Sequence, residues 1–244
     1  MKFMLPPPRR PGALRPAALL AGLALLLACL LPLASCSSGQ QLLYSVADGD
    51  RTCQVYGKNG RPGRIAVCQG STQIWETKVK VEKSLGALGG DYGFAVLDLN
   101  FDGRNDLKIA VAAAGDQRTE RVFLQTEDGS YEESDLFAGL YTLGTNPEEQ
   151  AVFSFTQSYQ HEDAVGDYPE SYITTDTTTG YVWKDGTLAP YRRISLTYYS
   201  ADDIYCLSVS DFNELLGEFL DPDDKWLSRQ EYSQTDFSFL YYFR

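Results

Sequence analysis

The stretch that decides the fold runs from Phe94 to Ala112 and reads Phe-Ala-Val-Leu-Asp-Leu-Asn-Phe-Asp-Gly-Arg-Asn-Asp-Leu-Lys-Ile-Ala-Val-Ala. Its two ends, Phe94–Leu97 and Leu107–Val111, are rich in β-branched and large apolar residues. Such short runs favour strands over helices. The sequence therefore predicts two strands joined by the polar segment between them.

That polar segment has the pattern D-x-N-x-D-G-x-x-D, formed by Asp98, Asn100, Asp102, Gly103 and Asp106. Side-chain oxygens recur at positions one, three, five and nine, and the carbonyl of Arg104 stands at position seven. Calcium is bound by six to eight oxygens, and a glycine at position six permits the sharp turn of a calcium loop. The pattern predicts a Ca²⁺ site whose ligands are Asp98, Asn100, Asp102, Arg104 and Asp106.

The loop differs from a helix-loop-helix calcium site at position twelve. Ile109 stands there and has no carboxylate, so the acidic ligand of that position would have to come from Asp106. The alternative interpretation is an ordinary acidic turn, because Asp-Gly turns are common.

The N-terminal segment predicts export and lipid anchoring. Lys2, Arg9, Arg10 and Arg15 precede an apolar run over residues 17–33, as in a signal peptide. The run ends in Leu-Ala-Ser-Cys36, which resembles the lipobox of bacterial lipoproteins. This resemblance implies a signal peptide over residues 1–35, a lipidated Cys36, and a protein held at the cell membrane or outer membrane outside the cytoplasm. An uncleaved membrane anchor is the alternative.

Residues 36–41 would form a polar tether and residues 42–244 a single domain. Loss of the four positive charges of the signal segment changes the formal net charge from −12 to −16. A chain this acidic disfavours nucleic acid and anionic lipid surfaces as partners. All 16 tyrosines lie in this part of the chain, and aromatic residues favour strands.

Two of the cysteines flank a predicted hairpin. Cys53 and Cys68 enclose a stretch that folds back near Gly60 and Arg61, which would place them opposite one another. An exported protein can form disulfides, so a Cys53–Cys68 bridge is expected, with two separate buried thiols as the alternative. Cys206 is interpreted as a small core residue.

The rest of the chain predicts antiparallel hairpins with one helix. Asp128-Gly129 and Asp185-Gly186 are strong hairpin turn signals. Apolar spacing predicts a docking helix over residues 210–220, and Phe237–Phe243 predicts a closing strand. The polar stretch Gln160–Thr179 is predicted to be a long exposed loop that contacts a partner. The fold class is mainly β, propeller-like or sandwich-like.

The calcium loop, together with Tyr181-Val-Trp-Lys-Asp-Gly-Thr-Leu188, resembles a family of small bacterial lipoproteins. These carry one FG-GAP/VCBS-like calcium loop in a propeller-like β fold, and the similarity covers roughly residues 52–199. The resemblance implies a non-catalytic domain of the cell envelope. Some members are immunity proteins that inhibit peptidoglycan hydrolases.

The sequence contains no recognisable catalytic motif. The single histidine, His161, is interpreted as an exposed loop residue, and there is no G-x-S-x-G or H-E-x-x-H pattern. Carboxylate pairs such as Asp202-Asp203, Asp223-Asp224 and Glu132-Glu133 allow the alternative of a cell-wall glycan hydrolase. The sequence instead favours a calcium-stabilised binding protein that is not an enzyme, with a protein or a cell-wall polymer as partner.

Overall fold

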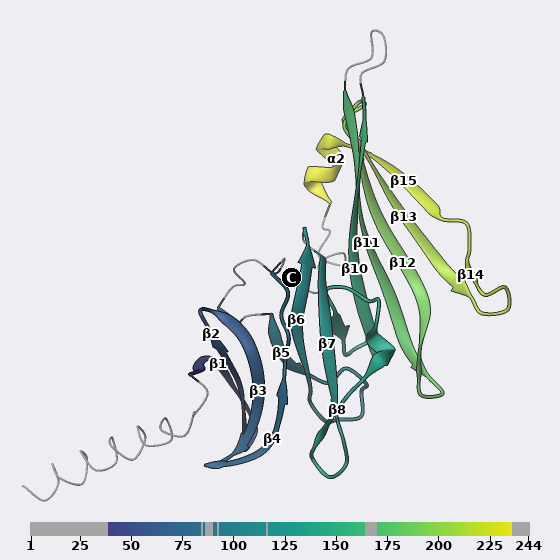
Figure 1. Ribbon diagram of the computed structural model, residues 1–244. Coiled ribbons are helices and arrows are strands. Elements are labelled where there is room, and N and C mark those ends of the chain that lie inside the picture. The colour runs from purple at the N-terminus through teal and green to yellow at the C-terminus, as the bar shows by residue number, and fades with distance from the viewer. Residues whose placement is uncertain are drawn as a thin grey trace, which may run out of the picture. The chain divides into compact units, whose positions relative to one another are not determined.

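The structure is a computed structural model, and it describes residues 39–83, 85, 90–91, 93–115, 117–163 and 170–235. It is mainly β, as predicted, with three antiparallel sheets and a short C-terminal helix, α2 (Arg229–Gln234) (Figure 1). The predicted closing strand Phe237–Phe243 and the signal peptide lie outside the described residues.

The first two sheets have four strands each. The first has the order β1-β2-β3-β4 and the second the order β5-β6-β7-β8. Their strands are β1 (Gln41–Asp48), β2 (Arg51–Lys58), β3 (Arg61–Gln69), β4 (Thr72–Lys78), β5 (Phe94–Leu97), β6 (Asp106–Ala114), β7 (Gln117–Gln125) and β8 (Tyr131–Glu133).

The third sheet has seven strands and the order β14-β13-β12-β11-β10-β9, with β15 also paired to β13. Its strands are β9 (Gly144–Asn146), β10 (Ala151–Glu162), β11 (Ser171–Lys184), β12 (Thr187–Tyr199), β13 (Ile204–Asn213), β14 (Glu218–Phe219) and β15 (Asp223–Ser228). A 3₁₀ turn, η2 (Asp135–Phe137), lies between β8 and β9.

The two four-stranded sheets pack face to face as a sandwich. Val55 and Ile65 of the first sheet share a buried cluster with Leu107, Ile109 and Phe123 of the second. Because side chains alternate along a strand, the neighbouring Val122 points to the opposite face, where it packs with Leu99, Phe137, Leu143 and Val152. The β5–β8 sheet therefore has a core on both of its faces.

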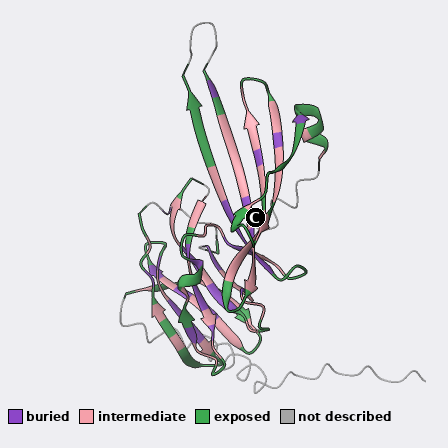
Figure 2. Ribbon diagram, turned by 90° about the vertical axis from the view of Figure 1, so that its right-hand side faces the viewer, coloured by how far each residue is buried: buried purple, intermediate pink, exposed green. Residues whose placement is uncertain are grey.

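The seven-stranded sheet is much more open than the sandwich. Figure 2 shows buried residues gathered in the two smaller sheets, whereas the long strands are mostly intermediate or exposed. Within the described ranges, the three sheets do not close into a barrel or a propeller. Of the two architectures that the sequence allowed, only the sandwich arrangement is present.

The predicted hairpins are present. Asp128-Gly129 lies in the five-residue connection between the paired residues Gln125 and Tyr131, whereas the cysteine hairpin and the Asp185-Gly186 hairpin have shorter turns. Lys58 pairs with Arg61, and Lys184 pairs with Thr187, which leaves two residues in each turn. Both residues of each turn have positive φ, as a type I′ turn requires. Asn-Gly and Asp-Gly pairs favour this turn because both residue types tolerate the left-handed region.

The predicted helix over residues 210–220 is wrong. Phe212 and Phe219 face one another as register partners of β13 and β14, with ring centroids 5.1 Å apart. The side-chain oxygen of Asn213 accepts hydrogen bonds from the N–H groups of Leu215 and Leu216, and Gly217 closes the turn at φ +70°. Apolar spacing alone did not distinguish this hairpin from a helix, because β13 gains two strand partners that local propensity does not foresee.

The predicted loop Gln160–Thr179 is also wrong, because strands β10 and β11 cover most of it. The two strands pair without interruption, from Ala151 opposite Val182 to Glu162 opposite Ser171. The threonines of β11 are β-branched, and this favours a strand on a half-buried surface. His161 accordingly lies on β10 rather than in a loop, although it is exposed as predicted.

Candidate functional site

The acidic loop lies between β5 and β6, as the sequence predicted. The carboxylate of Asp98 accepts hydrogen bonds from the N–H groups of Asp102 and Gly103, at 3.2 and 2.9 Å. Asn100 Oδ1 accepts from Asp102 N, and Asp102 Oδ1 accepts from Arg104 N. These bonds turn the side-chain oxygens inward, toward the backbone of the loop.

Asp106 differs from the other acidic residues of the loop because it is fully buried. Its two oxygens accept hydrogen bonds from Leu99 N and Gln125 N, both at 2.8 Å. Loss of solvent raises the pKa of Asp106 to about 6, although the two N–H donors act in the opposite direction. Asp106 thereby ties both ends of the loop to β7.

The loop is also fixed from the seven-stranded sheet. Trp183 of β11 donates its indole N–H to the carbonyl of Leu99, at 2.7 Å. Leu99 is fully buried and packs with Phe137 and Val152. The loop is therefore held by a buried carboxylate, a buried leucine and an indole from a distant strand.

The loop residues fit a hard cation by their chemistry. Three carboxylates, one amide oxygen and the carbonyl of Arg104 are the oxygen ligands that Ca²⁺ prefers. A bound cation would favour the ionised form of buried Asp106, which burial alone disfavours. Arg104 pairs with Asp102 at 2.6 Å, so its guanidinium shares one oxygen of that carboxylate.

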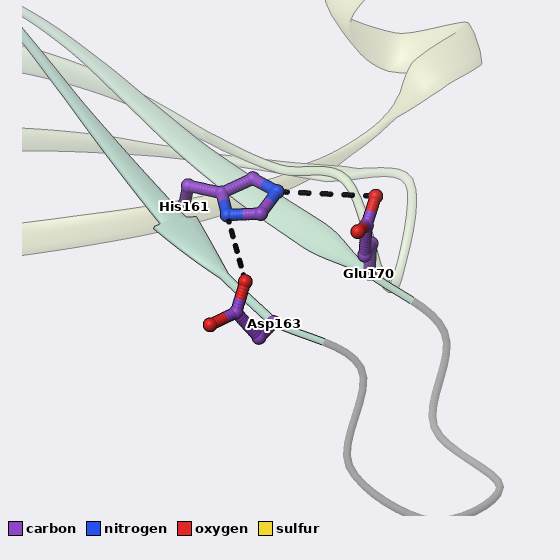
Figure 3. A group of neighbouring side chains, drawn as sticks. All are labelled: His161, Asp163 and Glu170. Atoms are coloured by element: carbon purple, nitrogen blue, oxygen red, sulfur yellow. Dashed lines mark ion pairs between the residues drawn. The ribbon is translucent and has the colours of Figure 1, made fainter.

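Three other side chains approach one another at the end of the β10–β11 hairpin. His161 Nδ1 lies 3.5 Å from Asp163, and Nε2 lies 3.9 Å from Glu170 (Figure 3). In the described part of the chain, this is where three metal-ligating groups have ligand atoms within 4.8 Å of one another. The two ring nitrogens face different carboxylates, however, and all three residues are exposed, so the group resembles a bridged ion pair.

The cysteine hairpin does not have the predicted register. Cys53 pairs with Val67, and Cys68 pairs with Thr52. Residues one step apart point to opposite faces of a sheet, so the two sulfurs are not brought together, and both cysteines are free. Burial, followed by the charge of Asp48, raises the pKa of the Cys53 thiol to about 12. Cys206 is buried, as expected of a core residue.

A second feature is a row of tyrosine rings in contact with one another across the seven-stranded sheet and α2, stacked at both ends of the row and tilted in its middle. We name it the tyrosine row: Tyr159, Tyr172, Tyr198, Tyr205 and Tyr232. Successive ring centroids lie 5.9, 5.8, 4.7 and 3.9 Å apart along the row.

The register explains why these tyrosines share one face. Tyr159 pairs with Thr174, Thr174 with Tyr198, and Tyr198 with Tyr205. Tyr172 lies two residues from Thr174 and therefore points the same way. The exposed end of the row consists of Tyr159 and Tyr172, which are 62% and 41% exposed.

Sequence reasoning did not find the tyrosine row. Tyr198 and the adjacent Tyr199 are both half-buried, and as neighbours in a strand they lie on opposite faces of the sheet. The ring of Tyr199 contacts that of Trp226 of β15 in a tilted arrangement, with centroids 5.5 Å apart. The signal that could have revealed the row is an aromatic residue on every strand, but its alignment depends on register.

Two of the carboxylates considered for glycan hydrolysis, Asp203 and Glu133, have structural partners. Asp203 accepts a hydrogen bond from the hydroxyl of Tyr198 and pairs with Arg229. Glu133 pairs with Arg121, which lowers the pKa of this carboxyl. The lowered pKa of Glu133 favours its ionised form, which is the opposite of what a general acid requires.

Cys36, the predicted site of the lipid anchor, lies outside the described residues. Within the ranges that the structure describes, no helix has the length and apolar character needed to span a bilayer.

Comparisons with known proteins give a distant likeness. No protein-family model matches the chain, and no curated protein matches it. One solved structure is similar, the "Structure of a Xanthomonas Type IV Secretion System related protein". The alignment covers 76% of this chain and 94% of the chain in that structure, with 12% sequence identity and a TM-score of 0.40. A likeness at this level carries no statement about what this chain binds.

Proposed function

We propose that this chain is a lipid-anchored binding protein of the cell envelope, with a calcium-stabilised loop and a protein partner that contacts the tyrosine row. The observation that carries the proposal is the exposed end of that row, Tyr159 and Tyr172. Tyrosine offers a large contact area at low entropic cost because it has only two side-chain torsions. Aromatic residues of this kind are enriched at the centres of protein interfaces.

The charge around the exposed end of the row favours a basic partner surface. Asp163 and Glu170 lie beside His161 at the end of the same hairpin, and both are largely exposed. The chain as a whole carries a formal net charge of −12. Complementary charge steers association and disfavours acidic competitors.

The partner class follows from the resemblance of the loop to the family that contains immunity proteins. We propose that the partner is a secreted peptidoglycan hydrolase and that binding inhibits it. The calcium loop would then act structurally, because it fixes the sandwich to β11 through Leu99 and Trp183. It would not participate in the chemistry of the partner.

Inhibition of purified peptidoglycan hydrolases by the full-length protein in detergent tests the proposal. We expect inhibition of at least one enzyme, and the double variant Tyr159→Ala/Tyr172→Ala should raise the inhibition constant about tenfold or more. Tyr199→Ala is the matched control, because Tyr199 is a tyrosine of the same sheet on the opposite face.

Two outcomes would contradict this assignment. Equal loss of inhibition in the Tyr199 control would remove the tyrosine row as the contact surface. Release of soluble fragments from purified peptidoglycan by this protein alone would place it among the hydrolases instead.

A further inference from the structure

A groove lies on the same face of the seven-stranded sheet as the tyrosine row. It has a volume of about 330 Å³ and is lined mainly by Phe153, Thr178, Gly180, Tyr191, Ile194 and Val209. Thr178 pairs with Ile194, and Ile194 pairs with Val209. Thr178, Ile194 and Val209 each lie four residues along the strand from Thr174, Tyr198 and Tyr205, which mark the face of the tyrosine row. Residues an even number apart in a strand point to the same face, so the groove and the tyrosine row share one face of the sheet.

The floor of the groove depends on a residue without a side chain. A Cβ atom at Gly180 would lie 2.4 Å from the ring of Tyr191 and 3.0 Å from that of Phe153. These rings pack edge to face across the glycine, with centroids 6.3 Å apart. Tyr191, Ile194 and Val209 all keep part of their surface exposed, so the groove offers apolar surface to an occupant, with the polar residues Asn146, Glu149 and Arg192 also in its lining.

The end of the described chain is fixed on this same face. The ring of Tyr232 in α2 stacks on Tyr205 at 3.9 Å, nearly parallel. Tyr232 also packs against the cluster of Leu196 and Leu227, to which Ile194 and Leu207 belong. α2 ends at Gln234, and the described chain ends one residue later, at Thr235. The remaining segment therefore begins on the face that contains the groove.

The remaining segment is long enough and has the right residue pattern. It reads Asp236-Phe-Ser-Phe-Leu-Tyr-Tyr-Phe-Arg244. Val209 lies four residues from Tyr205 along β13, which is about 13 Å at 3.3 Å per residue. Nine further residues can extend about 30 Å, so the segment reaches the groove with residues to spare.

Alternation in an extended chain places every second side chain on one face. In this segment that face would hold Phe237, Phe239, Tyr241 and Phe243. From Thr235, Phe239 and Tyr241 can reach about 13 and 20 Å along the sheet, which matches the distance to the groove. The opposite face would hold Ser238, Leu240, Tyr242 and Arg244.

We infer that residues 236–244 of this chain dock across the open face of the seven-stranded sheet, with Phe239 and Tyr241 in the groove lined by Tyr191, Ile194 and Val209. Docking buries aromatic surface that would otherwise face water, and this stabilises the sheet. The inference is independent of the proposed binding role, because it concerns only this chain.

Methyl NMR of Ile194 and Val209 in the full chain tests the inference. The double variant Phe239→Asp/Tyr241→Asp should shift both methyl resonances and lower the melting temperature by several degrees. Ser238→Asp/Tyr242→Asp is the matched control, with the same added charge on the opposite face, and it should change neither. Deletion of residues 236–244 should reproduce the first variant.

A peptide of residues 236–244, added to the shortened protein, should restore the methyl resonances, whereas a peptide of scrambled order should not. The inference is overturned if deletion leaves both resonances unchanged, or if the two double variants behave alike. It is also overturned if the deletion converts a dimer into a monomer, because the occupant would then be the tail of a second copy.

Discussion

At the scale of single residues, the acidic loop combines exposed and buried oxygens. Asp98, Asn100 and Asp102 hold the turn through backbone N–H groups, and buried Asp106 holds it to β7. Phe101 and Gly103 have positive φ, at +57° and +82°. Glycine tolerates this conformation without cost, whereas for phenylalanine it is uncommon. The hydrogen bonds of the loop therefore hold a conformation that an isolated peptide would rarely adopt.

We expect calcium to raise the melting temperature of the protein, and Asp102→Ala to remove that increase. At ten times the dissociation constant, ligand binding adds about 1.4 kcal/mol of stability. For a domain of this size that corresponds to a shift of about 3–5 °C. Thermal melts in calcium and in chelator measure it.

Asp128→Ala is the control for this substitution. Asp128 also precedes a turn glycine, is exposed, and accepts a hydrogen bond from Ser130 N. It stands outside the loop, so its variant should keep the calcium-dependent shift. Identical melts of the unmodified protein in calcium and in chelator would rule out a stabilising ion.

At the scale of elements, the segment after β12 shows how pairing overrides helical spacing. Phe212, Leu215, Leu216 and Phe219 have the spacing of one helix face. In the structure, Leu215 is 97% exposed and lies in the turn between β13 and β14. The two phenylalanines meet as cross-strand partners instead.

Substitutions at two leucines distinguish the strand pair from a helix. Leu215→Ser should change the free energy of unfolding by less than about 0.5 kcal/mol, because an exposed side chain loses no packing. Leu227→Ala should cost about 2–5 kcal/mol, because Leu227 is buried against Leu196. Urea denaturation measures both. A large loss from Leu215→Ser would support a buried helix in place of this turn.

At the scale of the whole molecule, a packed sandwich is continuous with a long open sheet. The sandwich has one buried cluster between its two sheets and a second on the other face of the β5–β8 sheet. The long sheet packs against α2 through a small cluster. An open sheet of this kind exposes aromatic and apolar side chains that a partner or a terminal segment can cover.

The proposed lipid anchor at Cys36 predicts a change in localisation when this cysteine is replaced. Cys36→Ser should abolish labelling by a radioactive fatty acid, because serine cannot form the thioether of a lipidated cysteine. The variant should also remain unprocessed or leave the membrane fraction. Ser35→Ala, at the neighbouring small residue, is the control and should be labelled normally. Unchanged labelling of the Cys36 variant would place the lipid elsewhere.

The sequence alone was sufficient for the features that depend on neighbouring residues. Asn59-Gly60 and Asp185-Gly186 form two-residue turns because their residue types tolerate positive φ, and no distant contact is needed. The strands on either side of the acidic loop follow from local composition, and so does the loop itself between Leu97 and Asp106.

Only the tertiary structure decided the features that depend on register. A shift of one residue moves a side chain to the other face of a sheet, and such a shift separates Cys53 from Cys68. The same alternation aligns tyrosines from four strands, which lie up to 46 residues apart in sequence, into one row. Likewise, the burial of Asp106 and the bond from Trp183 to Leu99 arise where segments distant in sequence meet. Local patterns cannot encode these contacts, because each depends on how strands pair and pack.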